Sequence, residues 1–408
     1  MVSGTVLAQV IPIALQPVLK RIYTPEDFGV LDIYLKTLGI LFVVFALKYD
    51  MGVVLPKNRV KALLLLNLSV IIAFAFTIIS IILISIFKTN LTELLQIKES
   101  YSFVLYILPF STLFFSLYNT FNYLLIRDKK FVSSSINRIS RRGAEGAIQV
   151  GFGFSSSLKS FGLFIGDLIG NFVFFLSAFY QSIGKIKYDK RFFKPSMLKA
   201  VAKEYSDLPK YNIIPEMLNG FFGASITFMV LSKFGMEEVG YLEPTQRILA
   251  IPAAFISVSV GQVLLQRISE SIGLKRKITK NIIQISLGLT AMIIPFYIII
   301  KIFGPDLFAW FFGDKWKISG TYATFLVMYF SISFITSPLG QVLIALKKFK
   351  INALWQIGKF AVIYAMVIFS YNDIFAFLKT YDIIGSAVYV IYGLMVFYFA
   401  ISYDKKIS

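Results

Sequence analysis

Long apolar runs separated by short polar loops follow one another along the whole chain. Each run has roughly 17 to 25 residues, the length that one helix needs to cross the hydrocarbon core of a bilayer. The twelve runs are Val2–Val18, Gly29–Leu47, Leu63–Phe87, Phe103–Ile126, Ser133–Phe154, Phe161–Ile183, Asn212–Leu231, Ile248–Leu265, Ile282–Phe303, Tyr322–Leu346, Ala353–Tyr371 and Ile383–Tyr403. This pattern predicts an all-α integral membrane protein with twelve transmembrane helices.

A short motif recurs 211 positions apart, each time between the first and second runs of one half of the chain. Its copies are Pro25–Asp32 (PEDFGVLD) and Met236–Glu243 (MEEVGYLE). A Glu, a Gly and a Leu are identical, and an acid replaces an acid at two further positions. The repeat indicates a duplicated unit with both copies inserted in the same direction, as in many transporters.

The composition limits both the class of protein and the side chains that a functional site can use. Hydrophobic residues make up 57% of the 408 positions and charged residues only 15%, which excludes a soluble domain. No basic segment or cleavage site precedes the first run, so we expect a retained helix rather than a signal peptide. The chain has no Cys and no His, which excludes disulfides, thiolate or imidazole metal ligands and histidine proton relays. We expect no metal, and without a Gly-rich nucleotide loop no cofactor.

The net charge of +19 predicts an orientation rather than a nucleic-acid partner, because the basic residues gather in every second loop. These loops and the C-terminal tail hold 25 Lys and Arg, against 10 in the other loops. The positive-inside rule therefore predicts cytosolic termini, with membrane lipids as contacts of the basic surface.

The longest inner loop, 184–210, separates six runs from six. It carries an apolar stripe of Met197, Leu198, Val201, Tyr205 and Leu208. The stripe predicts a helix lying on the cytosolic leaflet.

The run Ser133–Phe154 is the most polar of the twelve, since it contains Arg138, Arg141, Arg142 and Glu145. If it did not cross, the later basic loops would face outward and most of the positive charge would lie outside. Each Arg near the bilayer centre costs roughly 2.5–3.5 kcal/mol on insertion scales, so these side chains cannot face lipid. Guanidinium groups suit phosphate oxygens, which predicts a hydrated cavity where the three arginines bind an anion and Glu145 neutralises one of them. The alternative is a structural ion cluster, with Arg138 reaching the cytosolic surface.

Other charges at membrane depth are secondary candidates. We expect Lys20, Arg21, Lys36 and Lys359 to add positive charge to the cavity, and Asp32, Asp167 and Glu216 to balance charge or couple transport to an ion. Asp32 and Lys36 stand four apart, so they form either a self-neutralised pair or part of the cavity. Asp167, Glu216 and Lys359 have no partner nearby in the sequence, so each requires one across the bundle or must border water.

Prolines and glycines predict the irregular places. Pro12 and Pro17 in the first run, and Pro215 in the seventh, are expected to interrupt helices at corresponding positions of the two halves and to act as hinges. Bends are expected at Pro252, Pro295 and Pro338 in other runs. The glycines Gly162, Gly166 and Gly170 stand four apart, which predicts a face where two helices approach closely.

Several segments of the chain resemble bacterial polysaccharide and O-antigen flippases of the multidrug/oligosaccharidyl-lipid/polysaccharide exporter superfamily. The resemblance lies in Arg21–Gly29 (RIYTPEDFG), Lys48–Pro56 (KYDMGVVLP), Leu208–Asn212 (LPKYN), Val239–Arg247 (VGYLEPTQR) and the stretch from Ile251–Pro252 through Gly261–Gln262 to Gln266–Arg267. It covers nearly the whole chain in order and spacing. Two features depart from the family: the first helix lacks a basic lead-in, which leaves open a true start upstream of Met1, and Glu243–Pro244 replaces small or polar residues.

The resemblance implies two six-helix lobes around a central cavity, related by a pseudo-twofold axis along the membrane normal. In this chain they would be residues 1–183 and 211–408, joined by the linker 184–210. It also implies alternating access, a bacterial inner-membrane location, and a glycan on polyprenyl pyrophosphate whose phosphates meet the cavity cations. Polysaccharide polymerase and chain-length proteins are the implied partners.

Three other functions stay open at this stage. A cation-coupled exporter of the same superfamily would need an acidic cavity, whereas this one is basic. A membrane glycosyltransferase or polymerase could use Glu26 and Asp27 in the first outer loop as an acidic metal–sugar site, although the outer loops are short. An inactive scaffold would tolerate loss of all three arginines.

Overall fold

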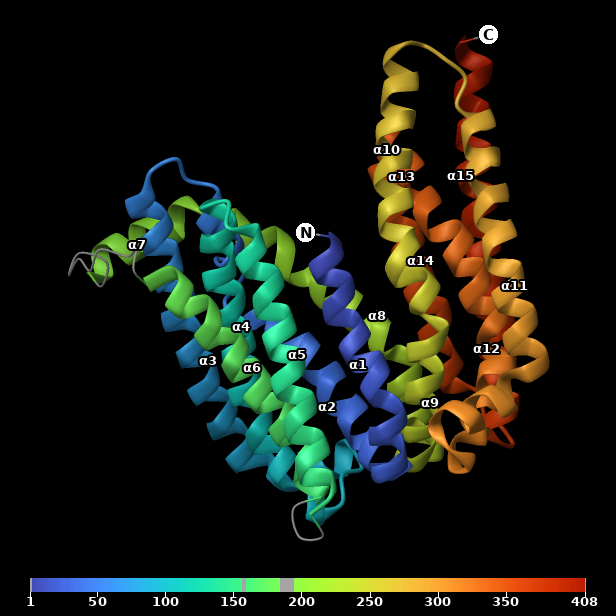
Figure 1. Ribbon diagram of the computed structural model, residues 1–408. Coiled ribbons are helices and arrows are strands. Elements are labelled where there is room, and N and C mark those ends of the chain that lie inside the picture. The colour runs from blue at the N-terminus through green and yellow to red at the C-terminus, as the bar shows by residue number, and fades with distance from the viewer. Residues whose placement is uncertain (1, 156–158, 184–193, 408) are drawn as a thin grey trace. The chain divides into compact units, whose positions relative to one another are not determined.

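The computed structural model describes residues 2–155, 159–183 and 194–407, and all of their regular secondary structure is helical (Figure 1). The N-terminal helices are α1 Val2–Ile22, α2 Pro25–Phe45, η1 Met51–Val54, α3 Arg59–Leu94, η2 Glu99–Tyr101, α4 Phe103–Arg127, α5 Phe131–Gly153, α6 Lys159–Ile183, α7 Pro195–Glu204, α8 Asp207–Phe234 and α9 Met236–Leu249. The others are the π-turn η4 Ala253–Ser257, α10 Val258–Gly273, α11 Thr279–Phe312, η5 Asp314–Trp316, α12 Lys317–Thr336, η6 Ser337–Leu339, α13 Gly340–Ala345, α14 Phe349–Ala365, η7 Met366–Ile368 and α15 Ile374–Ile407.

Helices cover all twelve apolar runs, although several runs are divided into two helical segments. Nine of the described segments are long and apolar enough to cross a membrane. On α3, apolar side chains such as Ile71, Phe74, Ile78 and Ile82 are exposed along one face. Exposed apolar surface of this extent indicates contact with lipid.

The chain divides into two compact units, Met1–Gly240 and Tyr241–Ser408. In the first unit α5 packs against α6, α1 and α4, and α8 packs against α2. In the second, α12 packs against α11 and α15, and α10 packs against α13. Contacts thus group α8 with the preceding helices, whereas the lobes expected from helix order place α8 in the C-terminal half.

The polar helix α5 is not among the nine apolar candidates, yet it packs along α6, which is one of them. Close packing of two antiparallel helices of 23 and 25 residues keeps them at the same depth. The polar run therefore lies beside an apolar candidate span, and its crossing of the membrane stays a prediction.

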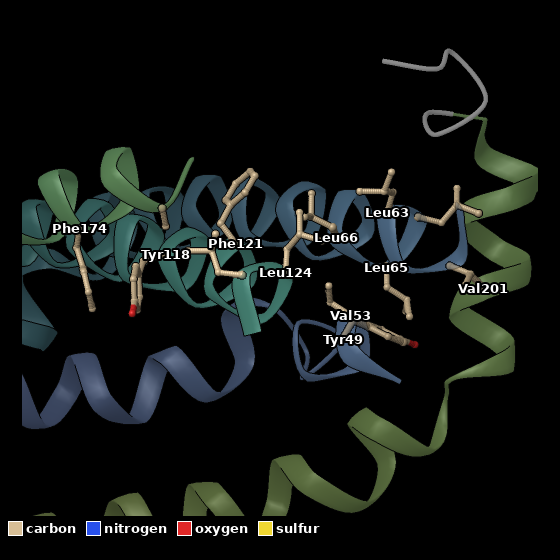
Figure 2. Packing of buried hydrophobic residues seen from close by; sticks show 13 residues of the cluster. Tyr49, Val53, Leu63, Leu65, Leu66, Tyr118, Phe121, Leu124, Phe174 and Val201 are labelled. Atoms are coloured by element: carbon tan, nitrogen blue, oxygen red, sulfur yellow. The ribbon is translucent and has the colours of Figure 1, made fainter. Parts of the chain in front are cut away.

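The helix expected in the long inner loop is present as α7, while residues 184–193 of that loop lie outside the described residues. The apolar stripe of this helix packs against α3, and its position at the cytosolic leaflet stays a prediction. Val201 is only 3% exposed and packs with Leu63 and Leu65 of α3, as Figure 2 shows. Met197, Leu198 and Tyr205 border the same cluster, and Lys61 of α3 forms an ion pair with Glu204 at 2.7 Å. The stripe therefore covers the end of the first bundle.

The first five residues of the two copies of the repeated motif, 25–29 and 236–240, meet each other within the first unit. A Cβ atom added at Gly29 would collide with the carbonyl oxygen of Met236, and one added at Gly240 would collide with that of Pro25. Gly29 and Gly240 are the fifth residues of the two copies, and Pro25 and Met236 are the first. The contact is therefore reciprocal, as expected for segments related by a twofold axis.

The expected interruptions at Pro12, Pro17 and Pro215 are wrong, because α1 and α8 run continuously through these residues. Proline removes a single N–H from the helix ladder, and membrane helices often absorb this loss without breaking. The chain is irregular instead just after Pro252, at the π-turn Ala253–Ser257, and at Pro338 in the turn between α12 and α13. Both of these places were expected to bend; Pro295 lies inside the continuous helix α11.

Candidate functional site

The centre of the candidate site is an ion pair between α5 and α6. Arg141 Nη2 lies 3.4 Å from Asp167 Oδ1, with the Arg141 side chain 14% exposed and that of Asp167 only 1% exposed. The guanidinium carbon lies 5.2 Å from the ring centroid of Phe115 and 5.3 Å from that of Phe174. Two aromatic faces and one carboxylate thus compensate for removing this cation from water.

Asp167 is the acceptor at the middle of a buried polar network. Its Oδ2 atom accepts hydrogen bonds from the Tyr34 hydroxyl at 2.8 Å, the Ser111 hydroxyl at 2.6 Å and the Asn171 amide at 2.9 Å. The donors come from α2, α4 and α6, so one carboxylate joins three helices, and its pair with Arg141 adds α5. A carboxylate has lone pairs for all these donors, and such satisfaction makes a buried charge tolerable.

Small residues bring α6 close enough to α5 for this contact. A Cβ at Gly166 would lie 3.0 Å from the carbonyl oxygen of Glu145, and one at Gly170 would lie 3.3 Å from that of Arg141. Gly162 likewise faces Tyr23 and Phe152. The prediction of a close helix approach at these glycines is confirmed, and the approach places Asp167 beside Arg141.

The next residue on α5 has a different environment. Arg142 Nη1 donates to Glu145 Oε2 at 2.7 Å, with side chains 35% and 16% exposed. Successive helical residues point about 100° apart, so Arg142 leaves the helix in a different direction from Arg141, although Glu145 lies near enough to both Arg141 and Asp167 to interact with them electrostatically. Arg138 is half-buried and lies near the Tyr118 hydroxyl. Glu145 therefore neutralises Arg142, and Asp167 balances Arg141.

The charges at the end of α1 do not share one environment. Lys20 is fully buried, with its Nζ 3.3 Å from the centroid of the Phe28 ring. Arg21 is exposed and donates to the carbonyl oxygen of Pro17 at 3.2 Å. Lys20 is therefore enclosed by the first unit, and Arg21 lies at its surface.

Asp32 and Lys36 do not form the self-neutralised pair that was one of two expectations. The Thr227 hydroxyl of α8 donates to Asp32 Oδ2 at 2.9 Å. Lys36 is half-buried and forms no ion pair with any described residue. The carboxylate of Asp32 is thus used between helices α2 and α8.

Glu216 has its partner just beyond the end of the second apolar run. It forms an ion pair with Lys48, whose side chain is 5% exposed. Asp50, 2% exposed, lies in the same charged group, and burial raises the pKa of its carboxyl from 3.8 to about 6 despite the opposing effect of Lys48. The sequence signal for this group was the pair Lys48 and Asp50 at the end of a span.

Lys359 belongs to the second unit. It is mostly buried, and its Nζ lies 4.7 Å from the Trp355 ring and 5.4 Å from the Tyr389 ring.

Of all the candidates, the structure brings Arg138, Arg141, Arg142, Glu145 and Asp167 together on α5 and α6, and places the remaining ones elsewhere. Sequence reasoning missed Tyr34, Ser111 and Asn171; only Asn171, four residues after Asp167 on the same helix, left a local signal.

Glu26 and Asp27, the acidic pair considered for an enzymatic site, both form structural contacts. Asp27 forms a capping box with Thr24 at the start of α2, and it also accepts from the Tyr101 hydroxyl at 2.7 Å. Glu26 forms an ion pair with Lys98 at 2.7 Å. Both carboxylates are occupied by contacts that stabilise the helix terminus and the outer loop.

Comparison of the sequence with models of known families identifies the family of the chain. The model of the family described as polysaccharide biosynthesis protein matches residues 18–321. The chain belongs to this family. No curated protein matches the sequence.

Solved structures with the same fold are transporters and flippases. An inward-facing multidrug resistance MATE family transporter of the MOP superfamily matches with a TM-score of 0.77 and 12% identity, over 98% of this chain and 99% of the other. Lipid II flippase MurJ in an inward closed conformation matches with a TM-score of 0.67 and 17% identity, over 100% and 90%. An outward-facing MATE transporter matches with a TM-score of 0.61 and 12% identity, over 100% and 94%. Such identities establish the fold alone, which is that of a multi-pass membrane protein.

Proposed function

We propose that this member of the polysaccharide biosynthesis family is a flippase for polyprenyl-pyrophosphate-linked oligosaccharide. It would move an O-antigen or other surface polysaccharide unit from the cytosolic to the outer leaflet of a bacterial inner membrane. The substrate's lipid tail would stay in the bilayer, while the charged and sugar parts cross through a hydrated cavity.

The observation that supports this proposal is that the three arginines on α5 differ in burial and in their ion-pair partners. Asp167 and two aromatic rings enclose Arg141, whereas Arg142 stays 35% exposed and Arg138 is half-buried. Arg142 and Arg138 stand four apart, so both can reach one ligand from one side of the helix. Their spacing suits a diphosphate, which accepts bidentate hydrogen bonds from guanidinium groups.

The ion pair between Arg142 and Glu145 gives the site a resting state. In the absence of substrate, Glu145 neutralises Arg142 within the protein. Pyrophosphate then competes with Glu145 for the guanidinium, and Arg141 stays fixed by Asp167 as part of the scaffold. Lys20, Arg21, Lys36 and Lys359 would add to the positive potential, and Asp32 and Glu216 would balance it.

The moving parts in this proposal are two six-helix lobes, residues 1–183 and 211–408, joined by 184–210. All twelve apolar runs would cross the membrane, with both termini in the cytosol. Flexing of α1 and α8 at Pro12, Pro17 and Pro215, without a break in either helix, would accompany the rocking of the lobes.

The test is a cellular export assay. Deleting the gene should leave polyprenyl-linked glycan facing the cytosol, where a membrane-impermeant label does not reach it. The variants Arg142→Glu and Arg138→Glu should each fail to restore labelling although they are inserted in the membrane at normal levels. Lys199→Glu, a substitution on the surface of α7, is the matched control and should restore export. Full export by both α5 variants would remove the proposed site.

The strongest rival is a cation-coupled small-molecule exporter, which the likeness to MATE transporters favours. A cavity for organic cations should be acidic, whereas α5 carries three arginines against Glu145 and the adjacent Asp167. Efflux of a cationic dye by cells expressing the chain, with no change in labelled glycan, would favour the rival. A glycosyltransferase or polymerase gains no support from Glu26 and Asp27, because both are engaged in structural contacts.

A further inference from the structure

A groove in the second unit separates two helices that follow each other in the chain. The turn 274–278 joins α10 to α11, and α10 packs mainly against α13 while α11 packs mainly against α12. The two backbones therefore stay apart, although near the turn Ile268 of α10 and Ile282 of α11 belong to one buried apolar cluster. The groove between them has a volume of about 350 Å³. Val260 and Val263 line it from α10, and Ile285 and Met292 line it from α11, so its walls are apolar.

Gly288 on α11 keeps the groove open. A Cβ atom added there would meet no atom within 4 Å, so no neighbouring helix requires this glycine. Gly304 on the same helix is different, because its Cβ would press on the backbone of Gly320 in α12. A glycine inside a helix is less favourable than an alanine, and no close helix contact at Gly288 requires the smaller residue. The space in front of it is available to a molecule other than the chain.

One end of the groove is strongly basic. Arg267 lines the groove six residues before the end of α10, or about 9 Å along the helix from the turn. It is exposed, and within the described parts of the chain it forms no ion pair or side-chain hydrogen bond. Lys275, Arg276, Lys277 and Lys280 follow in and beside the turn.

Two acids lie in this neighbourhood, and neither neutralises the basic end. The exposed Glu270 is the single acid between Arg267 and Lys280. Asp404 of α15 accepts from the backbone N–H groups of Ile278 at 2.8 Å and Thr279 at 3.1 Å, which uses its carboxylate to cap α11. The excess of cations therefore stays available to an anion.

We propose that this groove binds an anionic phospholipid, with one acyl chain between α10 and α11 and the phosphate at Arg267. The apolar lining extends from Ile285 to Met292 on α11, seven residues further along the helix or roughly 10 Å, which matches a stretch of a single acyl chain. Basic pockets between transmembrane helices on the cytoplasmic side suit acidic lipid head groups. The bound lipid would fill the space that α10 and α11 leave unpacked. This inference needs the membrane orientation but not the glycan substrate.

Native mass spectrometry tests the proposal on the full chain purified from nanodiscs of phosphatidylglycerol and phosphatidylcholine in equal amounts. The wild-type chain should retain phosphatidylglycerol in preference. Arg267→Gln should reduce this preference about fivefold, the effect expected for one cation at an anionic head group. Gly288→Phe should fill the groove and reduce retention of lipid of either head group. Leu287→Phe, which adds an aromatic ring to an exposed position beside the groove, should behave like the wild type.

Each result decides the proposal. Equal retention of the two lipids by the wild-type chain, or normal retention by Gly288→Phe, would overturn it. If Gly288→Phe is unstable, Gly288→Ala and Gly288→Ile replace it, because they add smaller side chains into the same open space. Normal lipid retention by both of these variants would also overturn the proposal. Exclusive retention of an added polyprenyl phosphate would instead assign the groove to the transported lipid. Loss of glycan export with normal phosphatidylglycerol binding would leave this inference standing and the two roles separate.

Discussion

Neighbouring arginines on α5 have different surroundings because a helix turns by about 100° per residue. Arg141 points into the bundle and meets Asp167, while Arg142 points elsewhere and stays partly exposed with Glu145. Insertion cost alone requires only that each charge avoid lipid. Arg141 is the more enclosed of the two, because α6 supplies Asp167 to it, whereas the partner of Arg142 is Glu145 on α5 itself.

Replacing Arg141 should destabilise the protein more than it weakens substrate binding. Arg141→Ala would leave Asp167 buried without its cation, and breaking a buried pair in this way costs about 3–5 kcal/mol. Arg141→Ala combined with Asp167→Asn should recover most of this loss, because the Asn keeps an acceptor for Tyr34 or Ser111. Thermal unfolding in detergent measures the cycle. Additive losses in the double variant would show that the two side chains are not coupled.

Asp50 should make stability depend on pH in the acid range. Burial raises its pKa from 3.8 to about 6, so the folded state holds the proton more tightly than the unfolded state. Its contribution is therefore most favourable below pH 4, declines on the order of 3 kcal/mol as pH rises through about 4 to 6, and is constant above. Asp50→Asn should remove this slope, as seen in unfolding temperatures from pH 4 to 8. An unchanged slope in the variant would assign the titration to another group.

The sequence revealed which α5 residues carry charge, and also the Glu145–Arg142 spacing, but not the full set of partners. Asp167 meets Arg141 because glycines on α6 permit a close approach, and this depends on the register between two helices. Tyr34 and Ser111 come from helices distant in the sequence, and no local pattern marks them. Burial of Asp50 likewise depends on α8, which supplies Glu216 to Lys48.

At the scale of elements, hydropathy predicted where helices lie better than where they break. Helices cover each apolar run because length and hydrophobicity suffice for insertion. Breaks depend on whether neighbouring groups satisfy the carbonyl that a proline leaves without a partner. Pro17 and Pro215 remain inside continuous helices, whereas the chain changes to a π-turn after Pro252, and hydropathy does not distinguish these cases.

The crossing of the repeated motifs should tolerate no side chain at its glycines. Gly29→Val would drive a Cβ atom into the carbonyl of Met236, and overpacking of this kind costs about 1–3 kcal/mol. Gly39→Val on the same helix is the matched control, because a Cβ there meets nothing within 4 Å. The first variant should lower the unfolding temperature by several degrees more than the second. Equal effects would mean that the close approach does not contribute to stability.

At the scale of the whole molecule, the repeated motif pointed to a duplicated protein, and the reciprocal contact between its copies agrees with that origin. The division into moving lobes is harder to read from sequence, because helix order and helix packing group α8 differently. The expected lobes follow from the order of the helices, whereas the compact units follow from their packing in one state of a protein whose halves are proposed to rock. The contact between α2 and α8 can therefore test whether these helices belong to different moving lobes, as helix order suggests, or to one unit, as helix packing suggests.

If the proposed lobes rock against each other, tying α2 to α8 should stop export. Asp32 and Thr227 are joined by a 2.9 Å hydrogen bond, and the chain has no natural Cys to interfere. We therefore expect Asp32→Cys with Thr227→Cys, joined by a short thiol-reactive linker, to lose glycan export and to regain it when a reducible linker is cleaved. Each single variant treated with the linker controls for loss of the native side chain.

A link within one proposed lobe should not have this effect. Asn122→Cys with Ser134→Cys replaces a comparable hydrogen-bonded pair, at 2.6 Å, between α4 and α5. This variant should export normally before and after linking, because both helices move as part of the same rigid group. Normal export by the linked α2–α8 variant would mean that these two helices move together, in agreement with the compact unit Met1–Gly240. The relative motion that alternates access would then occur between other helices.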